Sequence, residues 1–477
     1  MSAVSPHLKS LAELPGPKRL PLLGNLHEVE IEKFHLHLER WCDEFGPIFS
    51  IRMGPREIVC VADPAPINAM LRDRPDTYRR RRSFETIISE MGFNGVFSSE
   101  GDDWRRQRKQ VALALNTAHL HKFTPKLLDT TERLRRRWEL AADAGKSIDL
   151  CRDVMRYTVD ITTQLAFGVN VNTLETDGPV IQQQLDKVFP MLGRRINAPF
   201  PYWRYIRLRR DRELDEALAN IRVTVDGFIA DCRRRMADNP ELFAAPGNFL
   251  EAIIAAQATP DGAEFTDEDI YANVLTLLLA GEDTTANTIA WAGKYFIDYP
   301  EYFARARAEA DAVLAPARSA TEYGQLGELP FIEAFANETM RLKPIAPLNG
   351  LETNEGVELL GYYLPPNTPV LALTRHAAIN PDNFGEPEKF NPDRWLQPGS
   401  SEACPHNTQA FLPFGTGPRF CPGRNLALAE IKIVLAMLCR NFNIALSDPT
   451  RAVVEKLSFT MLPDNLFVTF SRREPPA

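Results

Sequence analysis

Residues Phe414 to Gly423 read Phe-Gly-Thr-Gly-Pro-Arg-Phe-Cys-Pro-Gly and lie just before an apolar stretch, Asn425 to Leu438. Glycine adopts backbone conformations closed to other residues, so this segment can turn tightly against a flat ligand. Cys421 stands where a helix is expected to begin, and the backbone N–H groups and dipole of a helix start stabilise a thiolate. Arg419 can reach an anionic group on the same ligand. The alternative is a buried cysteine in a tight loop.

A long helix is expected over Asp267–Asp298. Thr266 is a good N-cap, with Asp269 three residues later, and Pro300 ends the segment. At about 1.5 Å per residue such a helix is roughly 48 Å long, enough to cross a whole domain. Apolar residues surround its middle, which indicates a buried helix.

The middle of this helix reads Ala280-Gly281-Glu282-Asp283-Thr284-Thr285. Glycine costs about 1 kcal/mol relative to alanine in a helix interior, so we expect Gly281 to let a ligand lie flat against the helix. Thr284 can hydrogen-bond to the carbonyl four residues earlier, or it can disrupt the backbone hydrogen bonds of the helix at this point. Asp283 can exchange protons with solvent and Thr284 can pass them inward, which makes the pair a candidate proton relay. The alternative is an internal helix cap or an exposed polar face.

The loop around Cys421 resembles the haem-binding signature of the cytochromes P450, and the Asp283–Thr284 pair resembles that family's oxygen-activation motif. The resemblance covers essentially the whole chain. It implies the family's α+β, mainly α fold, with a long central helix over haem b and a smaller β-rich part, in one domain of residues 1–477. It implies Cys421 as the iron ligand, and Asp283 and Thr284 as catalytic residues. The implied haem contacts are Trp104, Arg108, Ala280, Gly281, His376, Phe414, Gly415, Arg419 and Gly423.

Glu338 and Arg341 lie three residues apart on a helix expected over Pro330–Leu342, a spacing that allows them to pair. Together with Arg394 they resemble the family's Glu–Arg–Arg network behind the haem. The resemblance implies a structural role, in which the network fixes the irregular loop that leads to Cys421. If buried, the network must be complete, because a lone buried charge is very costly.

Trp104 and Arg108 share one face of a predicted helix. They resemble the family's pair that binds a haem propionate; the alternative is a solvated basic helix. The family often places another propionate-binding Arg about ten residues after the Glu-x-x-Arg motif, but this chain has Leu351 there. The candidates to compensate are Arg375, His376 and the run Arg79–Arg82. His376 is equally a candidate for a satisfied buried histidine.

The composition of the chain limits its possible partners and its possible location in the cell. The net charge of −8 argues against a nucleic-acid partner. The seven cysteines form no Cys-x-x-Cys pair, which is typical of a reducing compartment. No apolar run approaches the ~20 residues of a membrane span, and there is no signal-peptide core. We therefore expect a cytoplasmic protein without a membrane span, resembling the bacterial members of the family.

The rest of the chain gives coarser signals. Residues 1–25 form a Pro-rich arm, Gly54-Pro55 joins two strand-like segments, Ile48–Met53 and Glu57–Val61, and a β-rich stretch is expected over Val357–Leu373. Four prolines are expected to end helices. These are Pro125, Pro179, Pro240 and Pro260.

The resemblance implies a monooxygenase that activates O2 with external electrons and hydroxylates or epoxidises its substrate. No flavin or iron–sulfur motif is visible, so we expect a ferredoxin- or flavodoxin-type donor with its reductase. A haem-thiolate peroxygenase or isomerase and a non-catalytic haem sensor are the rivals, and the Asp283–Thr284 pair argues against both. The donor is expected to dock on a basic patch. The patch comprises Arg105, Arg106, Lys109, Arg424 and Lys432.

The same resemblance implies an apolar substrate pocket, which favours a hydrophobic small molecule such as a fatty acid, terpenoid, steroid or polyketide. Its expected lining comprises Phe84, Ile87, Ile88, Met91, Phe93, Phe97, Phe189, Met191, Leu277, Ile345 and Met461.

Overall fold

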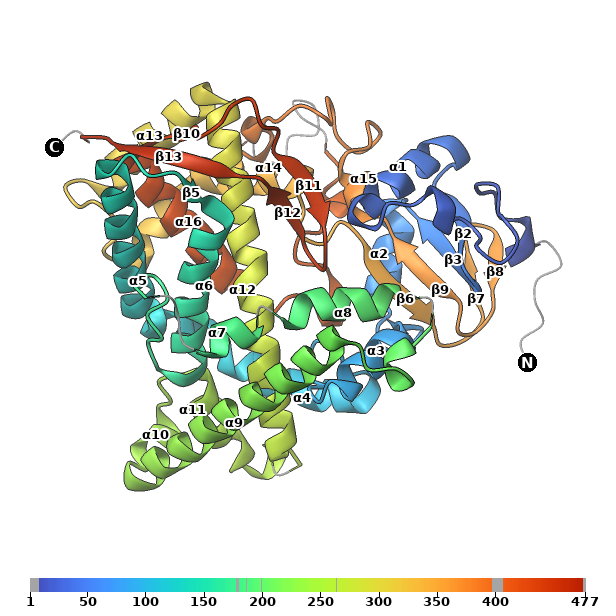
Figure 1. The fold of residues 1–477 in the computed structure, drawn as a ribbon, viewed down its shortest axis with the longest axis horizontal. Helices are drawn as coiled ribbons and strands as arrows, with labels where there is room; N and C mark the ends of the chain where they lie inside the picture. The colour runs from blue at the N-terminus through green and yellow to red at the C-terminus, as the bar shows by residue number, and fades with distance from the viewer. Residues whose placement is uncertain are drawn as a thin grey trace.

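The computed structural model describes residues 8–176, 180–185, 187–198, 200–262, 264–396 and 406–474. Most helices gather on one side of the molecule and the largest sheet lies on the other (Figure 1). The α+β, mainly α class predicted from the sequence is confirmed. The helices are α1 Phe34–Phe45, α2 Pro64–Arg72, α3 Arg82–Glu90, α4 Gly101–Ala114, α5 Thr117–Asp143, α6 Leu150–Phe167, α7 Val180–Leu185, α8 Val188–Asn197, α9 Arg209–Asp238, α10 Glu241–Ala244, α11 Phe249–Gln257, α12 Asp267–Asp298, α13 Pro300–Leu314, α14 Pro330–Leu342, α15 Thr374–Ala378 and α16 Arg424–Asn441.

The strands form four small sheets among the described residues. The largest has the order β2-β3-β9-β6-β4, in which β3 and β9 run parallel and the other neighbours antiparallel. The other sheets are β1-β8-β7, β10-β13-β5 and β11-β12. The strands are β1 Lys9–Ser10, β2 Ile48–Met53, β3 Arg56–Val61, β4 Tyr78–Arg80, β5 Ile148–Asp149, β6 Asn349–Thr353, β7 Val357–Leu359, β8 Tyr362–Leu364, β9 Pro369–Ala372, β10 Phe442–Leu446, β11 Val454–Leu457, β12 Met461–Asp464 and β13 Phe467–Arg472.

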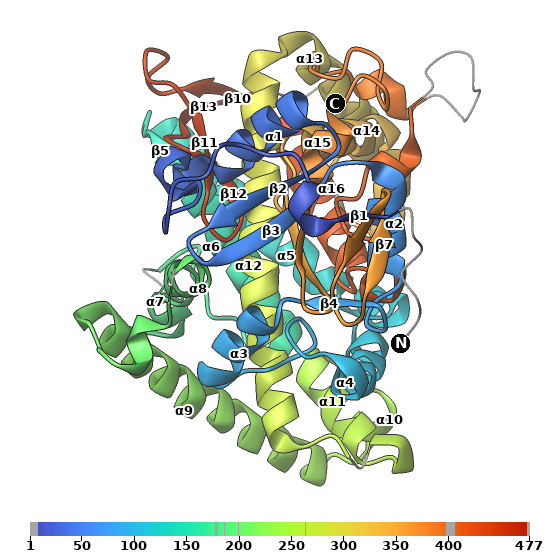
Figure 2. The ribbon, with the colours of Figure 1, turned by 90° about the vertical axis from the view of Figure 1, so that its right-hand side faces the viewer.

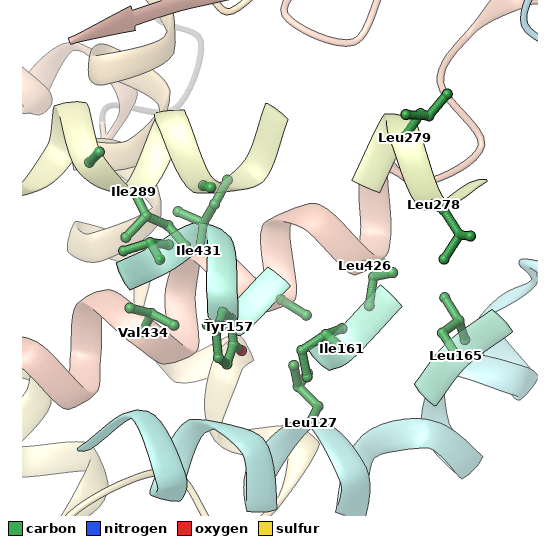
Figure 3. Close-up of a cluster of buried hydrophobic side chains, with 14 of the residues drawn as sticks. Leu127, Tyr157, Ile161, Leu165, Leu278, Leu279, Ile289, Leu426, Ile431 and Val434 are labelled. Atoms are coloured by element: carbon green, nitrogen blue, oxygen red, sulfur yellow. The ribbon is translucent and has the colours of Figure 1, made fainter. Parts of the chain in front are cut away.

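The helix α12 has the bounds that the sequence predicted, Asp267–Asp298, and crosses the molecule from end to end (Figure 2). Thr266 and Asp269 form the expected reciprocal capping box. Side chains of α12 pack with those of α5, α6 and α16 in one hydrophobic core (Figure 3). Labelled members include Leu127, Tyr157, Ile161, Leu278, Ile289 and Val434.

The four proline predictions have different outcomes. Pro240 and Pro260 follow the ends of α9 and α11, as expected. Pro125 lies inside α5, so that prediction is wrong. Proline costs about 3 kcal/mol in a helix interior, and the burial of Phe123, Leu127 and other side chains along α5 offsets that cost. Pro179 lies outside the described residues.

The Pro-rich arm packs along the largest sheet from residue 14 onward. The Ser50 N–H donates to the Pro15 carbonyl over 2.8 Å. A Cβ on Gly16 would lie 2.1 Å from the Ser50 carbonyl oxygen, so only glycine allows this approach. Among the described residues, no helix is long and apolar enough to cross a membrane.

Candidate haem site

The loop that carries Cys421 is fixed by two glycines with positive φ, Gly415 and Gly417, both at +71°. A Cβ on Gly417 would lie 2.7 Å from the Cα of Arg72, so the loop rests directly on α2. The Cys421 N–H donates to the Phe414 carbonyl over 3.0 Å and closes the turn. These contacts hold the cysteine in place through the backbone.

The half-buried Cys421 side chain lies at the N-terminal end of α16, where Gly423 is the N-cap. Burial raises the pKa of the Cys421 thiol, while the backbone N–H groups of Gly423 and Arg424 and the charge of Arg108 act in the opposite direction. A Cβ on Gly423 would be in ordinary contact with Sγ, at 3.9 Å. The pKa of the thiol is raised on balance, and the hydrogen-bond donors and the cation beside it are the groups that favour its anionic form.

Trp104 and Arg108 lie on α4, beside this loop. Arg108 Nη2 donates to the Phe420 carbonyl over 2.6 Å, a contact that the sequence did not predict. The buried Trp104 ring carries the Arg419 guanidinium, 4.3 Å from its centroid. The pair thus supports the cysteine loop, and its predicted contact with a haem propionate stays a prediction.

Next to Trp104, two guanidinium groups pair with one carboxylate, and the guanidinium of Arg80 lies close enough to interact with all three charges. Arg419 pairs with Glu100 over 2.7 Å and Arg74 pairs with Glu100 over 3.3 Å. The backbone N–H of Arg80 also donates to Glu100, over 2.8 Å. The Nε atoms of Arg74, Arg80 and Arg419 are buried without a hydrogen-bond partner, and so is one acceptor, Glu100 Oε2.

This arrangement fits haem b. Buried polar atoms are normally satisfied, so several orphaned donors in one place indicate a missing acceptor. The cations of this cluster outnumber its carboxylates, and haem b carries two anionic propionates. The residues present therefore match the group that the sequence implied.

Only one residue in the middle of α12 is exposed. Ala280 is the one exposed residue between Asp269 and Ile297, and its neighbours Leu279 and Glu282 are buried. Thr284 Oγ1 donates to the Ala280 carbonyl over 2.9 Å, the back-bond considered from the sequence. Since α12 is helical throughout, the ladder is not opened at this point. A ligand placed against Ala280 would also lie beside Thr284.

Asp283 is directed elsewhere on the same helix. Burial raises the pKa of the Cys151 thiol on α6, and the carboxylates of Asp149, Asp464 and Asp283 add to that effect. The Asp283 carboxylate is thus close enough to the Cys151 thiol to raise its pKa, and Asp283 directly precedes Thr284 on α12. This position is compatible with passing a proton along the helix.

The structure gives Gly281 a packing role that the sequence did not predict. A Cβ there would lie 2.8 Å from Thr162 Oγ1 and 3.1 Å from Thr162 Cγ2, both on α6. The absent side chain therefore allows α6 to approach α12, and the expected contact of Gly281 with the haem stays a prediction. Close packing of the two helices requires glycine at this position. The sequence alone could not distinguish this reason for the glycine from a ligand contact.

The network around Glu338 is complete and buried. Glu338 and Arg341 have no exposed surface and Arg394 is 2% exposed. Arg341 donates to Glu338 from Nε at 2.9 Å and from Nη2 at 2.8 Å, and Arg394 donates from Nε at 3.0 Å. Trp395 Nε1 and the Asn391 N–H supply two further donors at 2.9 Å, which the sequence analysis missed.

The network also fixes the irregular loop. Arg341 donates to the carbonyls of Ala378, Pro387 and Lys389. The Ala378 carbonyl ends α15, and the other two carbonyls belong to the segment between α15 and the cysteine loop, so the contacts are consistent with the predicted structural role.

Arg375 and His376 do not join the arginine cluster. His376 Nε2 is 2.9 Å from Asp43, and Nδ1 is 3.7 Å from the Cys42 sulfur, both on α1. Arg375 pairs with Glu455 over 2.6 Å. Both ring nitrogens of His376 are thus occupied, so we do not retain it as a haem contact.

The predicted basic patch is only partly present. Lys432 is 6% exposed and pairs with Glu333, so it cannot contribute to a surface. Arg105 and Arg106 are paired with acidic residues, including Asp76 and Asp269. Lys109 and Arg424 are exposed. Spacing alone could not show which cations have partners.

Four aromatic side chains from distant segments meet near α3 and α8. The Phe459 ring stacks on Phe189 with centroids 5.0 Å apart, and lies 6.5 Å from Phe84 and 6.2 Å from Phe97. Three of them belong to the predicted pocket lining. Phe459 was not predicted, although it lies two residues before Met461, which was expected to line the pocket.

Comparisons with known proteins agree with this geometry. The self-sufficient cytochrome P450 monooxygenase CYP505E3 of Phanerodontia chrysosporium is 27% identical over 97% of this chain and 43% of its own length. Cytochrome P450 27C1 of Danio rerio is 26% identical over 97% of this chain and 88% of its own length. The chain spans less than half the length of the self-sufficient relatives that it matches.

The fold is similar to that of the cytochrome P450DA haem domain, with a TM-score of 0.85 at 22% identity, over 97% of this chain and 98% of that one. The family model described as cytochrome P450 matches residues 14–470. Members of this family are monooxygenases that use haem b as an iron–thiolate cofactor. This family explains why a cysteine loop, an arginine cluster and a buried Glu–Arg–Arg network occur together in one fold. The chain belongs to the cytochrome P450 family.

Proposed function

We propose that the protein is a haem-thiolate monooxygenase that hydroxylates or epoxidises a hydrophobic small molecule. The observation that carries the proposal is the position of Cys421 at the start of α16, beside a cluster of buried arginines with unsatisfied donors. A thiolate suits the iron of haem b, and the excess of positive charge in the cluster suits its propionates.

In this proposal each part of the site has one task. Cys421 holds the iron from its side of the haem, and Arg419 and Trp104 hold the propionate side. When bound, the haem supplies the activation of O2 and the oxidation itself. Thr284 Oγ1, beside the open face at Ala280, delivers protons that Asp283 takes up from solvent. The aromatic cluster excludes water and orients the substrate.

The substrate class follows from the pocket. Phe84, Phe97, Phe189 and Phe459 present rings, which favour an apolar ligand over a charged one. A fatty acid, terpenoid, steroid or polyketide has this character.

For electron supply we propose a ferredoxin- or flavodoxin-type donor that docks on the cysteine-loop side. Phe420 is 37% exposed there, and Arg424 and Lys109 are exposed beside it. An apolar centre with basic neighbours suits an acidic donor, and the net charge of −8 elsewhere would orient it.

We also propose a cytoplasmic location. The support is that all six cysteines among the described residues are free thiols, as expected in a reducing compartment.

The carbon monoxide difference spectrum of the reduced protein tests the haem-thiolate assignment. The wild type should absorb near the wavelength that names the family, and Cys421→Ser should lose that band. Cys439→Ser is the matched control, because Cys439 is a fully buried core thiol on the same helix. Retention of the band in Cys421→Ser would contradict the assignment. Spectral titrations with the four substrate classes would then identify the ligand.

A further inference from the structure

Two threonines of α6 contact α12 just before Thr284. The two helices pack in the hydrophobic core of Figure 3. Thr158 and Thr162 lie one turn apart on α6, so their side chains share one face of that helix. Thr162 fills the space beside Gly281, where a Cβ would lie 2.8 Å from its Oγ1. This face of α6 is therefore fitted closely to the turn of α12 that leads to Thr284.

Thr158 makes a hydrogen bond to the backbone of α12. Its side chain has no exposed surface, and its Oγ1 donates to the Glu282 carbonyl over 2.9 Å. The carbonyls of Val154 and Met155, in its own helix, lie 3.3 and 3.0 Å away and compete for the same proton. The acceptor on α12 is the closest of the three. A fully buried hydroxyl thus joins α6 to the main chain of α12.

This contact is not the usual behaviour of a threonine in a helix. Threonine hydroxyls inside helices commonly bond to the carbonyl four residues earlier. Thr162 and Thr163 do so, with bonds to the Thr158 and Val159 carbonyls over 2.6 and 2.7 Å. Thr158 has the same kind of acceptor within reach, but its closest acceptor belongs to the other helix. We therefore attribute a specific task to its hydroxyl.

The Glu282 carbonyl lies in the turn that positions Thr284. Thr284 Oγ1 donates to the Ala280 carbonyl over 2.9 Å, so its direction depends on where this turn of backbone lies. Backbone hydrogen bonds make a helical turn a rigid unit. A donor that holds the Glu282 carbonyl therefore restrains the rotation of the whole turn about the axis of α12. Gly281 allows α6 to come close enough for Thr158 to reach that carbonyl.

We propose that Thr158 is a positioning residue for proton delivery. Its hydroxyl holds the Glu282 carbonyl and, through the backbone of α12, sets the place of Thr284 Oγ1 beside Ala280. Thr158 is buried between two helices, so it acts through α12 and not by touching a substrate. This inference rests on the proposed function, because a proton relay at Thr284 has a task only in a chain that binds haem.

Four side chains at position 158 separate the hydroxyl from the size of the residue. Thr158→Val replaces the hydroxyl with a methyl group and keeps the branched shape, while Thr158→Ser and Thr158→Ala differ from each other only in the hydroxyl. Thr163→Val is the matched control, since Thr163 is 1% exposed on the same helix and bonds to its own backbone. Each variant is purified as the holoenzyme.

The first measurement is the infrared stretching band of carbon monoxide bound to the reduced holoenzyme, a probe that responds to hydroxyl dipoles close to it. Thr284→Ala gives the shift that follows from complete loss of the Thr284 hydroxyl. Thr158→Val and Thr158→Ala should broaden the band or shift it in the same direction, because that hydroxyl is placed less firmly. Thr158→Ser and Thr163→Val should keep the wild-type band. A residue that only stabilises the fold would not move it.

The second measurement is amide hydrogen exchange in α12, followed by mass spectrometry on peptides that contain Glu282 and Thr284. Thr158→Val should speed exchange in these peptides about 2- to 10-fold, the effect of losing one buried hydrogen bond. Thr158→Ser and Thr163→Val should change it less than about twofold. Peptides from the end of α12 near Asp298 should exchange as in the wild type in every variant, since the bond acts locally.

The outcomes separate this inference from the proposed function. A wild type without a haem-thiolate band in carbon monoxide would remove both. A wild type with that band, together with an unchanged infrared band and unchanged exchange in Thr158→Val, would overturn the role of Thr158 alone. Equal changes in Thr158→Val and Thr163→Val would also overturn it, because they would show a general loosening of α6. If Thr158→Val gives no folded holoenzyme, Thr158→Ser and Thr158→Ala decide: identical results for the two would overturn the inference.

Discussion

The indole of Trp395 donates to Glu338 Oε2 over 2.9 Å while its ring packs on Phe411, with centroids 4.5 Å apart. One side chain thus connects the buried Glu338 network to the segment just before the cysteine loop. The haem-binding loop and the network form a single structural unit through this residue.

Trp395→Phe should lower the free energy of unfolding by about 1.5–3 kcal/mol, because a hydrogen bond to a charged group is lost while the ring contact is kept. Thermal unfolding of the holoenzyme would measure this. Trp291→Phe is the matched control, since its Nε1 is buried without a partner. An equal effect of both substitutions would show that ring volume, and not the hydrogen bond, is responsible.

Glu338→Ala should have a larger effect, because Arg341 and Arg394 would both remain buried without their carboxylate. Breaking a buried ion pair costs about 3–5 kcal/mol. We expect haem-free or aggregated protein, measured as the ratio of haem to polypeptide after purification. Normal haem content would mean that the network does not support the loop.

Thr284→Ala should keep haem and substrate binding but divert reducing equivalents to peroxide. General acid catalysis contributes about 10²–10⁴-fold, so product per NAD(P)H consumed should fall clearly. The reference is Thr288→Ala, which removes the same kind of back-bond, 3.0 Å to the Thr284 carbonyl, one turn later. Equal coupling in wild type and Thr284→Ala would rule out the relay.

Gly281→Ala should destabilise the fold by about 1–3 kcal/mol through overpacking against Thr162. Haem spectra of the surviving holoenzyme should be unchanged, because the added methyl points to α6. Adding Thr162→Ala should restore most of the stability. A shifted haem spectrum without loss of stability would instead place Gly281 against the cofactor.

The rate of first electron transfer should fall as salt rises, because exposed charges are screened over a Debye length of ~8–10 Å. Arg424→Glu should lower it further, with haem content unchanged. Arg105→Glu should have less effect, since Arg105 is already paired with Asp76 and Asp102. A rate indifferent to salt and to both reversals would exclude this face as the docking site.

The long helix could be predicted to the residue because its signals are local. Thr266 and Asp269 cap it, and a proline follows at its end. The Glu338 network could be predicted because its spacing is short and its third member precedes the cysteine loop. The hydrogen bond from Trp395 could not be predicted, because no spacing of residues in the sequence indicates an indole donor.

Other features depend on packing between distant segments. Gly281 allows close contact with α6, which lies more than a hundred residues earlier in the chain. Pro125 is tolerated inside α5 because other side chains of this helix are buried, and a rule based on local sequence cannot take that burial into account. Which arginine of the run Arg79–Arg82 faces the site depends on the register of β4 against β6. In each case the deciding contact is nonlocal.

The single exposed position in the middle of α12 bears on how such a protein can be redesigned. Ala280 borders open space while its neighbours Leu279 and Glu282 are packed. A larger side chain there would change the volume beside Thr284 without displacing any core contact of the helix. Ligand binding and fold stability are therefore separable at this residue, so that substitutions at Ala280 should change haem binding or the space beside Thr284 at little cost in folded protein.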